Sequence, residues 1–265
     1  MKDMKSLKIV AACTLILSLL VGCGAKEDRL ATVQENKKLV LGTSADYPPF
    51  EFRKTVDGKD QIVGFDIEIA KEIAKDLGVE LEIKDTSLTT LPEELKTGKI
   101  DIAIAGLDPS PERENAMEFS TPYYLAEAGV IVRAADKDKY KTPEDLKGLK
   151  VGVQLGSTFE NVIQQIPDAK KEMLDKVNDL VLALEANRLE AVVVEKPVAA
   201  AFAANRKEVA VAPVELKPAS EGYVIGVRKG SVKLRDEVNK TLERLKQQGK
   251  LDEYITQAVQ LAEQQ

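Results

Sequence analysis

The most informative part of this 265-residue chain is a strand, a turn and a short helix that carries Arg113 in its first turn. Residues 100–105 read as a buried strand, and after a glycine turn Ser110 is a good N-cap for a short helix. Arg113 then stands beside unpaired backbone N–H groups, where its cation opposes the helix dipole. A guanidinium beside such N–H groups at the end of a strand indicates half of an anion site. The alternative on this segment alone is a surface arginine paired with Glu114 or Glu118.

Two other turns could complete a small-ligand site. In the first, consecutive prolines hold Tyr47 in an extended loop, where its ring could stack on a ligand at small entropic cost. We interpret the two phenylalanines that follow it as core residues. In the second, the backbone N–H groups of Gly156, Ser157 and Thr158 open a helix and could hold a carboxylate, although such residues also serve purely as helix caps.

Glu195 directly follows the apolar run 191–194, which reads as a buried strand. A carboxylate in that position needs a cationic partner or strong hydrogen bonds. A bound ammonium would serve, and the alternatives are Lys196 or the solvated rim of the fold. An arginine and amide-rich turns for an anion, with a carboxylate for a cation, predict a ligand with both charges close together. A free α-amino acid is the obvious small molecule of this kind.

Short apolar runs that alternate with helical patterns predict an α/β architecture with largely parallel sheets. We expect an amphipathic helix over 66–77, a short helix that begins after Thr142, and a helical tail over 232–262 broken at Gly249. Because open α/β sheets bind ligands at the carboxyl ends of their strands, the turns named above should converge. The predicted strands are 39–44, 81–85, 100–105, 129–134, 150–154, 191–195 and 223–229.

The chain is expected to cross twice between two lobes, near residues 119–124 and again near 218–222. Two connecting strands of this kind make a natural hinge. The alternative is one doubly wound sheet without a cleft between lobes.

The amino terminus reads as an export signal. A lysine-rich start and an apolar run are followed by Leu20-Val21-Gly22-Cys23, which resembles a bacterial lipobox. We predict cleavage before Cys23, lipid on its sulfur and new amino group, and a flexible tether over 24–38. The alternative is an uncleaved N-terminal anchor.

Composition excludes several function classes. Removing residues 1–22 takes away three lysines and one aspartate and leaves 35 basic against 43 acidic side chains, a net charge of −8. This charge argues against nucleic acid as a partner. The chain has no histidine, which excludes catalytic Ser-His-Asp and Cys-His arrangements and argues against a zinc site, and we expect no cofactor.

Six collinear stretches of the chain form a recognisable pattern. They are GTSADYPPFEF (42–52), VGFDIEIAKEIAKDLGV (63–79), TGKIDIAIAGL (97–107), PERENAMEFSTPYY (111–124), LKGLKVGVQLGST (146–158) and AVVVEKPVA (191–199). This pattern resembles the polar amino acid-binding proteins of ABC importers, extracellular solute-binding proteins of family 3. The resemblance covers residues 39 to about 255 and implies a two-lobed type II periplasmic-binding-protein fold with two hinge strands. On this pattern, lobe 1 would comprise 39–126 and 221–265, and lobe 2 would comprise 127–220.

The resemblance also implies roles for the ligand-binding residues. Arg113 would grip the α-carboxylate, helped by the amide of Thr158 and the turn at Ser157. Tyr47 would stack on the ligand side chain, with Leu88 near the opposite wall. Glu195 would take the α-amino group.

Three positions depart from the family pattern. Asp108 stands where the family usually has Ser or Thr, so its carboxylate must turn toward the ligand's ammonium or be neutralised by Arg113. Glu195 is one methylene longer than the usual Asp, and the two changes could be linked. Ala105 and Gly106 lack the hydroxyls that some members use.

We therefore expect a lipid-anchored receptor on the extracytoplasmic face of the cell membrane, without catalysis. As the substrate-binding component of an amino acid ABC transporter, it would deliver its ligand to a membrane permease, and we expect a monomer. Acidic side chains near the predicted cleft favour a cationic amino acid. The alternatives are a periplasmic dehydratase-like enzyme on the same fold and a ligand-sensing domain.

Overall fold

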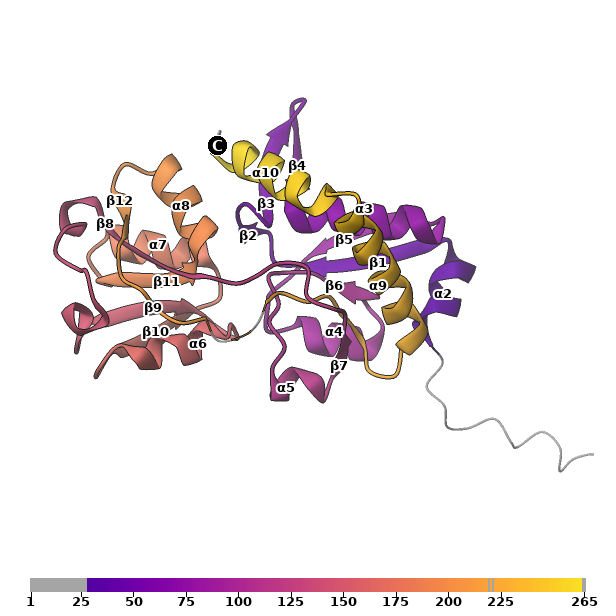
Figure 1. Cartoon of the computed structure of the whole chain (residues 1–265), viewed down its shortest axis with the longest axis horizontal. Helices are drawn as coiled ribbons and strands as arrows, with labels where there is room; N and C mark the ends of the chain where they lie inside the picture. The colour runs from indigo at the N-terminus through magenta and orange to yellow at the C-terminus, as the bar shows by residue number, and fades with distance from the viewer. Residues whose placement is uncertain (1–27, 219, 221, 264–265) are drawn as a thin grey trace, which may run out of the picture.

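The computed structural model describes residues 28–218, 220 and 222–263. Two lobes lie side by side and are joined by two crossing segments without regular secondary structure (Figure 1). The predicted signal sequence and Cys23 lie outside the described residues. Within the described ranges, no helix is long and apolar enough to cross a membrane.

Lobe 1, as we name the half built on the first sheet, has five strands in the order β5-β1-β6-β13-β7. Helices α3 and α9 cover one face of this sheet and α4 covers the other (Figure 1). The strands are β1 (Lys38–Thr43), β5 (Glu80–Asp85), β6 (Ile102–Ala103), β7 (Met117–Phe119) and β13 (Gly226–Arg228). The helices are α2 (Arg29–Asn36), α3 (Phe65–Leu77), α4 (Leu91–Thr97), α5 (Pro111–Glu114), α9 (Val232–Gln247) and α10 (Lys250–Ala262).

Lobe 2 is built on the second sheet, in the order β10-β9-β11-β8-β12. Its strands are β8 (Ala128–Arg133), β9 (Lys150–Gln154), β10 (Lys170–Leu174), β11 (Ala191–Glu195) and β12 (Val209–Ala212). Its helices are α6 (Phe159–Val162), α7 (Val177–Glu185) and α8 (Lys196–Asn205), with 3-10 turns at Ala134–Asp136, Pro143–Leu146 and Ile163–Gln165. A separate sheet of lobe 1 joins β2 (Asp46–Tyr47), β3 (Glu51–Val56) and β4 (Lys59–Val63).

Both large sheets are mixed, whereas the sequence predicts largely parallel ones. In lobe 1, β13 runs antiparallel to β6 and β7, and in lobe 2, β8 runs antiparallel to β11 and β12. Each of these strands follows a crossing from the other lobe. A strand that enters at the carboxyl edge of its new sheet must run away from that edge, which makes it antiparallel to its neighbours.

The two crossing segments pair with each other. Tyr124 and Tyr223 form an isolated antiparallel bridge, in which the Tyr223 N–H donates to the Tyr124 carbonyl at 2.8 Å. The Tyr123 N–H donates in turn to the Tyr223 carbonyl at 2.9 Å. The connection is therefore a two-stranded hinge, as the sequence predicts. The residue boundaries predicted for the lobes stay a prediction.

The predicted tether over 24–38 is wrong for Arg29–Asn36, which form α2 on lobe 1. Asp28 caps this helix by accepting the Leu30 N–H at 3.0 Å, and Val33 is buried against the core. Arg29 forms an ion pair with the buried Asp101. The sequence pattern misses α2 because only one apolar side chain is fully buried and the docking depends on a distant acid.

Gly64 begins α3 with φ 128° and ψ 179°, a conformation almost restricted to glycine. A methyl group there would lie 2.3 Å from the carbonyl oxygen of Phe50. We expect Gly64→Ala to lower the free energy of unfolding by about 3 kcal/mol or more, measured by urea denaturation. Gly58→Ala is the matched control, because Gly58 also has positive φ but no atom within 4 Å, and should cost about 1 kcal/mol. Equal losses in the two variants would contradict this account of Gly64.

Candidate functional site

Arg113 lies in α5 and points across the gap between the lobes. Its guanidinium donates to the carbonyl oxygens of Asp108 and Gly156, each at 2.7 Å, and Gly156 belongs to lobe 2. The Ser110 hydroxyl accepts the Arg113 N–H at 3.3 Å, so the predicted N-cap fixes the first turn. Burial lowers the pKa of Arg113, although the guanidinium stays charged. A buried guanidinium held by two carbonyls leaves further N–H donors for an anion.

Asp108 is buried beside Arg113 and is held by hydroxyl groups. Thr158 of lobe 2 and Ser220 of the second crossing segment donate to its two carboxylate oxygens. Burial raises the pKa of Asp108, while the two hydroxyls and the charge of Arg113 oppose that rise. The two hydroxyl groups and the charge of Arg113 therefore stabilise the buried Asp108 carboxylate, and no second cation is among these partners.

Glu195 ends β11 and is fully buried. Its carboxylate accepts the Glu127 N–H and the Tyr223 hydroxyl, the latter at 2.8 Å. Burial is the main reason that its pKa rises to about 8, with the charges of Asp108 and Glu127 adding to the effect. A cation next to a buried carboxyl group with a raised pKa strongly stabilises its charged form.

Tyr223 lies where the second crossing segment meets lobe 2, because its hydroxyl donates to the Glu195 carboxylate at 2.8 Å. Sequence reasoning misses it, since a tyrosine inside an apolar strand carries no charge to mark it. Its ring packs edge-on against Phe50, with centroids 5.3 Å apart. The sequence interpretation of Phe50 as a core residue agrees with its complete burial.

Tyr47 and Gly106 form the aromatic side of the site. The Tyr47 hydroxyl accepts the Glu195 N–H at 3.0 Å and so crosses between the lobes. Gly106 has φ 52°, and a methyl group there would lie 3.2 Å from the Tyr223 ring and 3.3 Å from the Tyr47 ring. Glycine at this turn therefore lets two aromatic rings approach the backbone closely.

The remaining predicted site residues lie apart from this polar network. Leu88 and Ala105 are buried together in an apolar cluster of lobe 1. Ser157 turns its hydroxyl to the Gln154 carbonyl of its own turn, at 2.7 Å. Contacts across the lobes include Tyr47, Asp108, Arg113, Thr158 and Glu195, whereas no such contact involves the side chains of Leu88, Ala105 or Ser157 among those described.

Asp66 and Glu51 are two buried acidic residues that the sequence analysis does not single out, and both lie close to aromatic residues of the site. Asp66 accepts the Gly106 N–H at 3.2 Å and the Tyr123 hydroxyl at 2.9 Å. Glu51 is 1 % exposed, and its Oε2 atom has no hydrogen-bond partner; the same is true of the buried Oγ1 atom of Thr43, at the end of β1. Burial raises the pKa of Asp66 to about 6 and raises that of Glu51 well above its usual range.

Among the described residues, no group of three or more Cys, Asp or Glu side chains is placed to hold a metal ion. The contacts of Arg113, Asp108 and Glu195 described above are those of charged and hydrogen-bonding groups. Such a site can bind a small zwitterion at both of its charges.

Comparison with known proteins identifies one family. Residues 39–259 match the family model of bacterial extracellular solute-binding proteins, family 3. The arginine-binding extracellular protein ArtP of Bacillus subtilis is 35 % identical over 252 residues, which cover 93 % of this chain and 94 % of that protein.

Two solved structures share the architecture. An amino acid ABC transporter substrate-binding protein from Streptococcus pneumoniae, bound to L-arginine, superposes with a TM-score of 0.84 at 36 % identity and covers 88 % of this chain and 98 % of that one. An ancestral arginine-binding protein bound to glutamine gives a TM-score of 0.74 at 38 % identity, over 82 % of this chain and 96 % of that one.

Proposed function

This chain belongs to the bacterial extracellular solute-binding proteins of family 3, and from this premise we propose that it binds a cationic amino acid between its lobes and delivers it to an ABC permease. The observation that carries the proposal is that the buried side chains of Arg113, Asp108 and Glu195 are each held by a group from the opposite lobe or from a crossing segment, where the lobes meet. The protein acts as a monomeric receptor without catalysis.

The α-carboxylate binds to Arg113. A guanidinium can give a carboxylate two parallel hydrogen bonds, and the two carbonyls that already hold Arg113 fix the plane in which its remaining N–H groups point. The backbone of Thr158, at the start of α6, adds amide donors on the lobe 2 side.

The α-ammonium binds between Glu195 and Asp108. Both carboxylates are buried, and burial raises the pKa of each, so a cation between them relieves an unfavourable environment. The hydroxyls of Thr158 and Ser220 already orient Asp108.

The ligand side chain passes Tyr47 and ends near Glu51 and Asp66. Two groups support this position: the unpartnered Oε2 of Glu51 and the unpartnered Oγ1 of Thr43 can both accept hydrogen bonds from a guanidinium. Asp46, another acid near the cleft, already faces Lys176 at 3.6 Å and is not needed for the ligand. The relatives named for arginine agree with this choice of ligand class.

The family and the amino-terminal sequence pattern support a proposal for the cellular setting. Ligand binding favours the arrangement in which the lobes meet, and the permease recognises that arrangement. Lipid on Cys23 holds the receptor at the extracytoplasmic face of the cell membrane.

Arg113→Ala should weaken the binding of L-arginine by about two orders of magnitude or more, since the α-carboxylate loses its buried partner. Isothermal titration calorimetry measures the change. Arg235→Ala is the matched control, because Arg235 forms ion pairs with Glu118 and Asp236 on lobe 1 away from the site. Near wild-type affinity in Arg113→Ala would rule out its assigned role.

The affinity for amino acids should rise with pH between about 6 and 8. The pKa of Glu195 is raised to about 8, so this carboxyl group is largely protonated below that pH and must lose its proton to pair with an ammonium. If binding releases one proton, the affinity rises by up to about tenfold for each pH unit. Titrations with L-glutamine at pH 6, 7 and 8 measure the slope without a contribution from a charged ligand side chain at Glu51, and Glu195→Gln should flatten it. A flat profile in the wild-type protein would count against Glu195 as the ammonium partner.

Glu51→Gln should weaken L-arginine binding by about tenfold or more and leave L-glutamine binding within about twofold of wild type, because only the guanidinium needs the negative charge. Parallel calorimetric titrations with the two ligands provide the comparison. Equal losses for both ligands would mean that Glu51 supports the fold of the site and does not select the ligand.

A further inference from the structure

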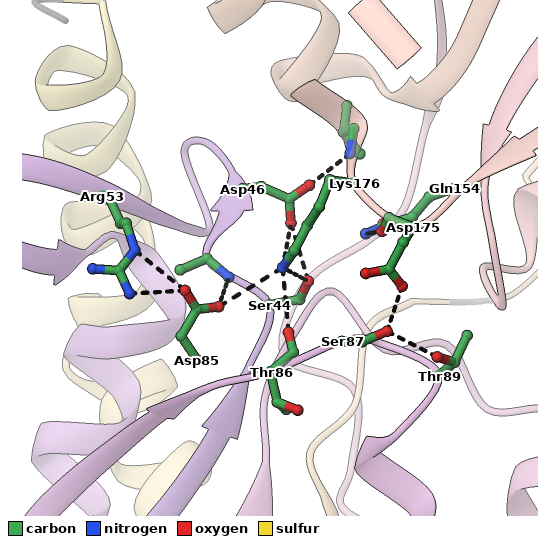
Figure 2. Close-up of polar contacts among 12 residues, drawn as sticks. Ser44, Asp46, Arg53, Asp85, Thr86, Ser87, Thr89, Gln154, Asp175 and Lys176 are labelled. Carbon is green, nitrogen blue, oxygen red and sulfur yellow. Dashed lines mark hydrogen bonds and ion pairs between the residues drawn. The ribbon is translucent and has the colours of Figure 1, made fainter. Parts of the chain in front are cut away.

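Lys176 of lobe 2 reaches into lobe 1 outside the proposed ligand site. Its ammonium donates to the Ser44 hydroxyl at 3.1 Å and to the Thr86 carbonyl at 3.3 Å, and it lies 3.6 Å from Asp46 and 3.8 Å from Asp85 (Figure 2). These lobe 1 groups follow or end strands β1 and β5. One lysine therefore meets four oxygen-bearing groups of the opposite lobe.

Asp46 also caps a helix of the other lobe. Val177 is the first residue of α7, and the residue at its N-cap is Lys176, whose side chain has no oxygen to accept a hydrogen bond. The Asp46 carboxylate accepts the Val177 N–H at 2.6 Å instead. A carboxylate at a helix N-terminus satisfies an unpaired N–H and is favoured by the helix dipole. Separation of the lobes would remove this cap.

Asp175 makes a further contact between the lobes. The hydroxyl of Ser87, just after β5, donates to the Asp175 carboxylate, and the Gln154 side chain holds the Asp175 carbonyl at 3.1 Å (Figure 2). Consecutive residues 175–177 thus all bond to lobe 1. They come from one short connection between β10 and α7, so the contacts form and break together.

We propose that segment 175–177 and its partners in lobe 1 form a latch that stabilises the arrangement in which the lobes meet, independently of which amino acid is bound. None of the latch contacts described above includes Arg113, Asp108, Glu195 or Glu51, and burial and Asp66 influence the pKa of Glu51 more than Lys176 does. This inference rests on the proposed function, because a latch on closure changes affinity only if ligand binding and closure are coupled. Apparent affinity scales with the populated fraction of the binding-competent arrangement.

Lys176→Met tests the latch, because it keeps the apolar stem and leaves Asp46 without its cation, whereas Asp85 keeps Arg53 at 2.9 Å. We expect affinity for L-arginine, L-lysine and L-glutamine to fall by the same factor, about fivefold to tenfold, wherever the wild-type protein binds them. Lys171→Met is the matched control, since Lys171 pairs with Glu160 inside lobe 2 at 3.1 Å, and its affinities should stay within about twofold of wild type.

Two further measurements separate a latch from other roles. Small-angle X-ray scattering without ligand should give a larger radius of gyration for Lys176→Met than for wild type and Lys171→Met. Raised salt should weaken ligand binding in the wild-type protein more than in Lys176→Met, because the ammonium and its acids are only partly shielded from solvent.

Unchanged affinity and radius of gyration in Lys176→Met would overturn the proposal. Loss of affinity for one amino acid alone would also overturn it, since that pattern marks a residue that contacts the ligand side chain. Failure of the proposed function has a different signature, in which the wild-type protein binds no amino acid at all. The scattering comparison still tests the latch in that case.

Discussion

The structure depends on the burial of opposite charges where the two lobes meet. Arg113, Asp108 and Glu195 are each less than 10 % exposed, and each is held by a group from the opposite lobe or from a crossing segment. Leaving one such charge without a partner costs about 3–5 kcal/mol. The sheets, the hinge and the turns therefore have to bring separate parts of the chain together at one place. This requirement gives the affinity for a zwitterion its physical basis.

The contacts between the lobes divide into two sets. One set, around Tyr223, faces the charges of the proposed ligand, and the other, around Lys176, involves only protein groups. Separate sets allow the strength of closure and the choice of ligand to change independently. The mixed sheets support both sets, because each antiparallel strand enters from the other lobe and begins at the shared edge.

Local sequence patterns predict most strands of the two large sheets and the charged residues of the proposed site, but not the β2–β4 sheet or the contacts between distant segments. The strand before Glu195 and the N-cap before Arg113 depend on neighbouring residues, and both are found as predicted. Ser220, Glu51 and Lys176 act through partners far away in the chain, so their spacing carries no signal. The helix at Arg29–Asn36 was missed for the same reason, since its ion pair joins residues 72 positions apart.

Calorimetric titration with arginine and with two analogues that each lack one charge tests the central claim most directly. Agmatine lacks the α-carboxylate, and 5-guanidinopentanoic acid lacks the α-amino group. If Arg113 and Glu195 grip opposite ends of one zwitterion, L-arginine binds and each analogue binds at least about a hundredfold more weakly. Binding of either analogue as tightly as arginine would contradict the account.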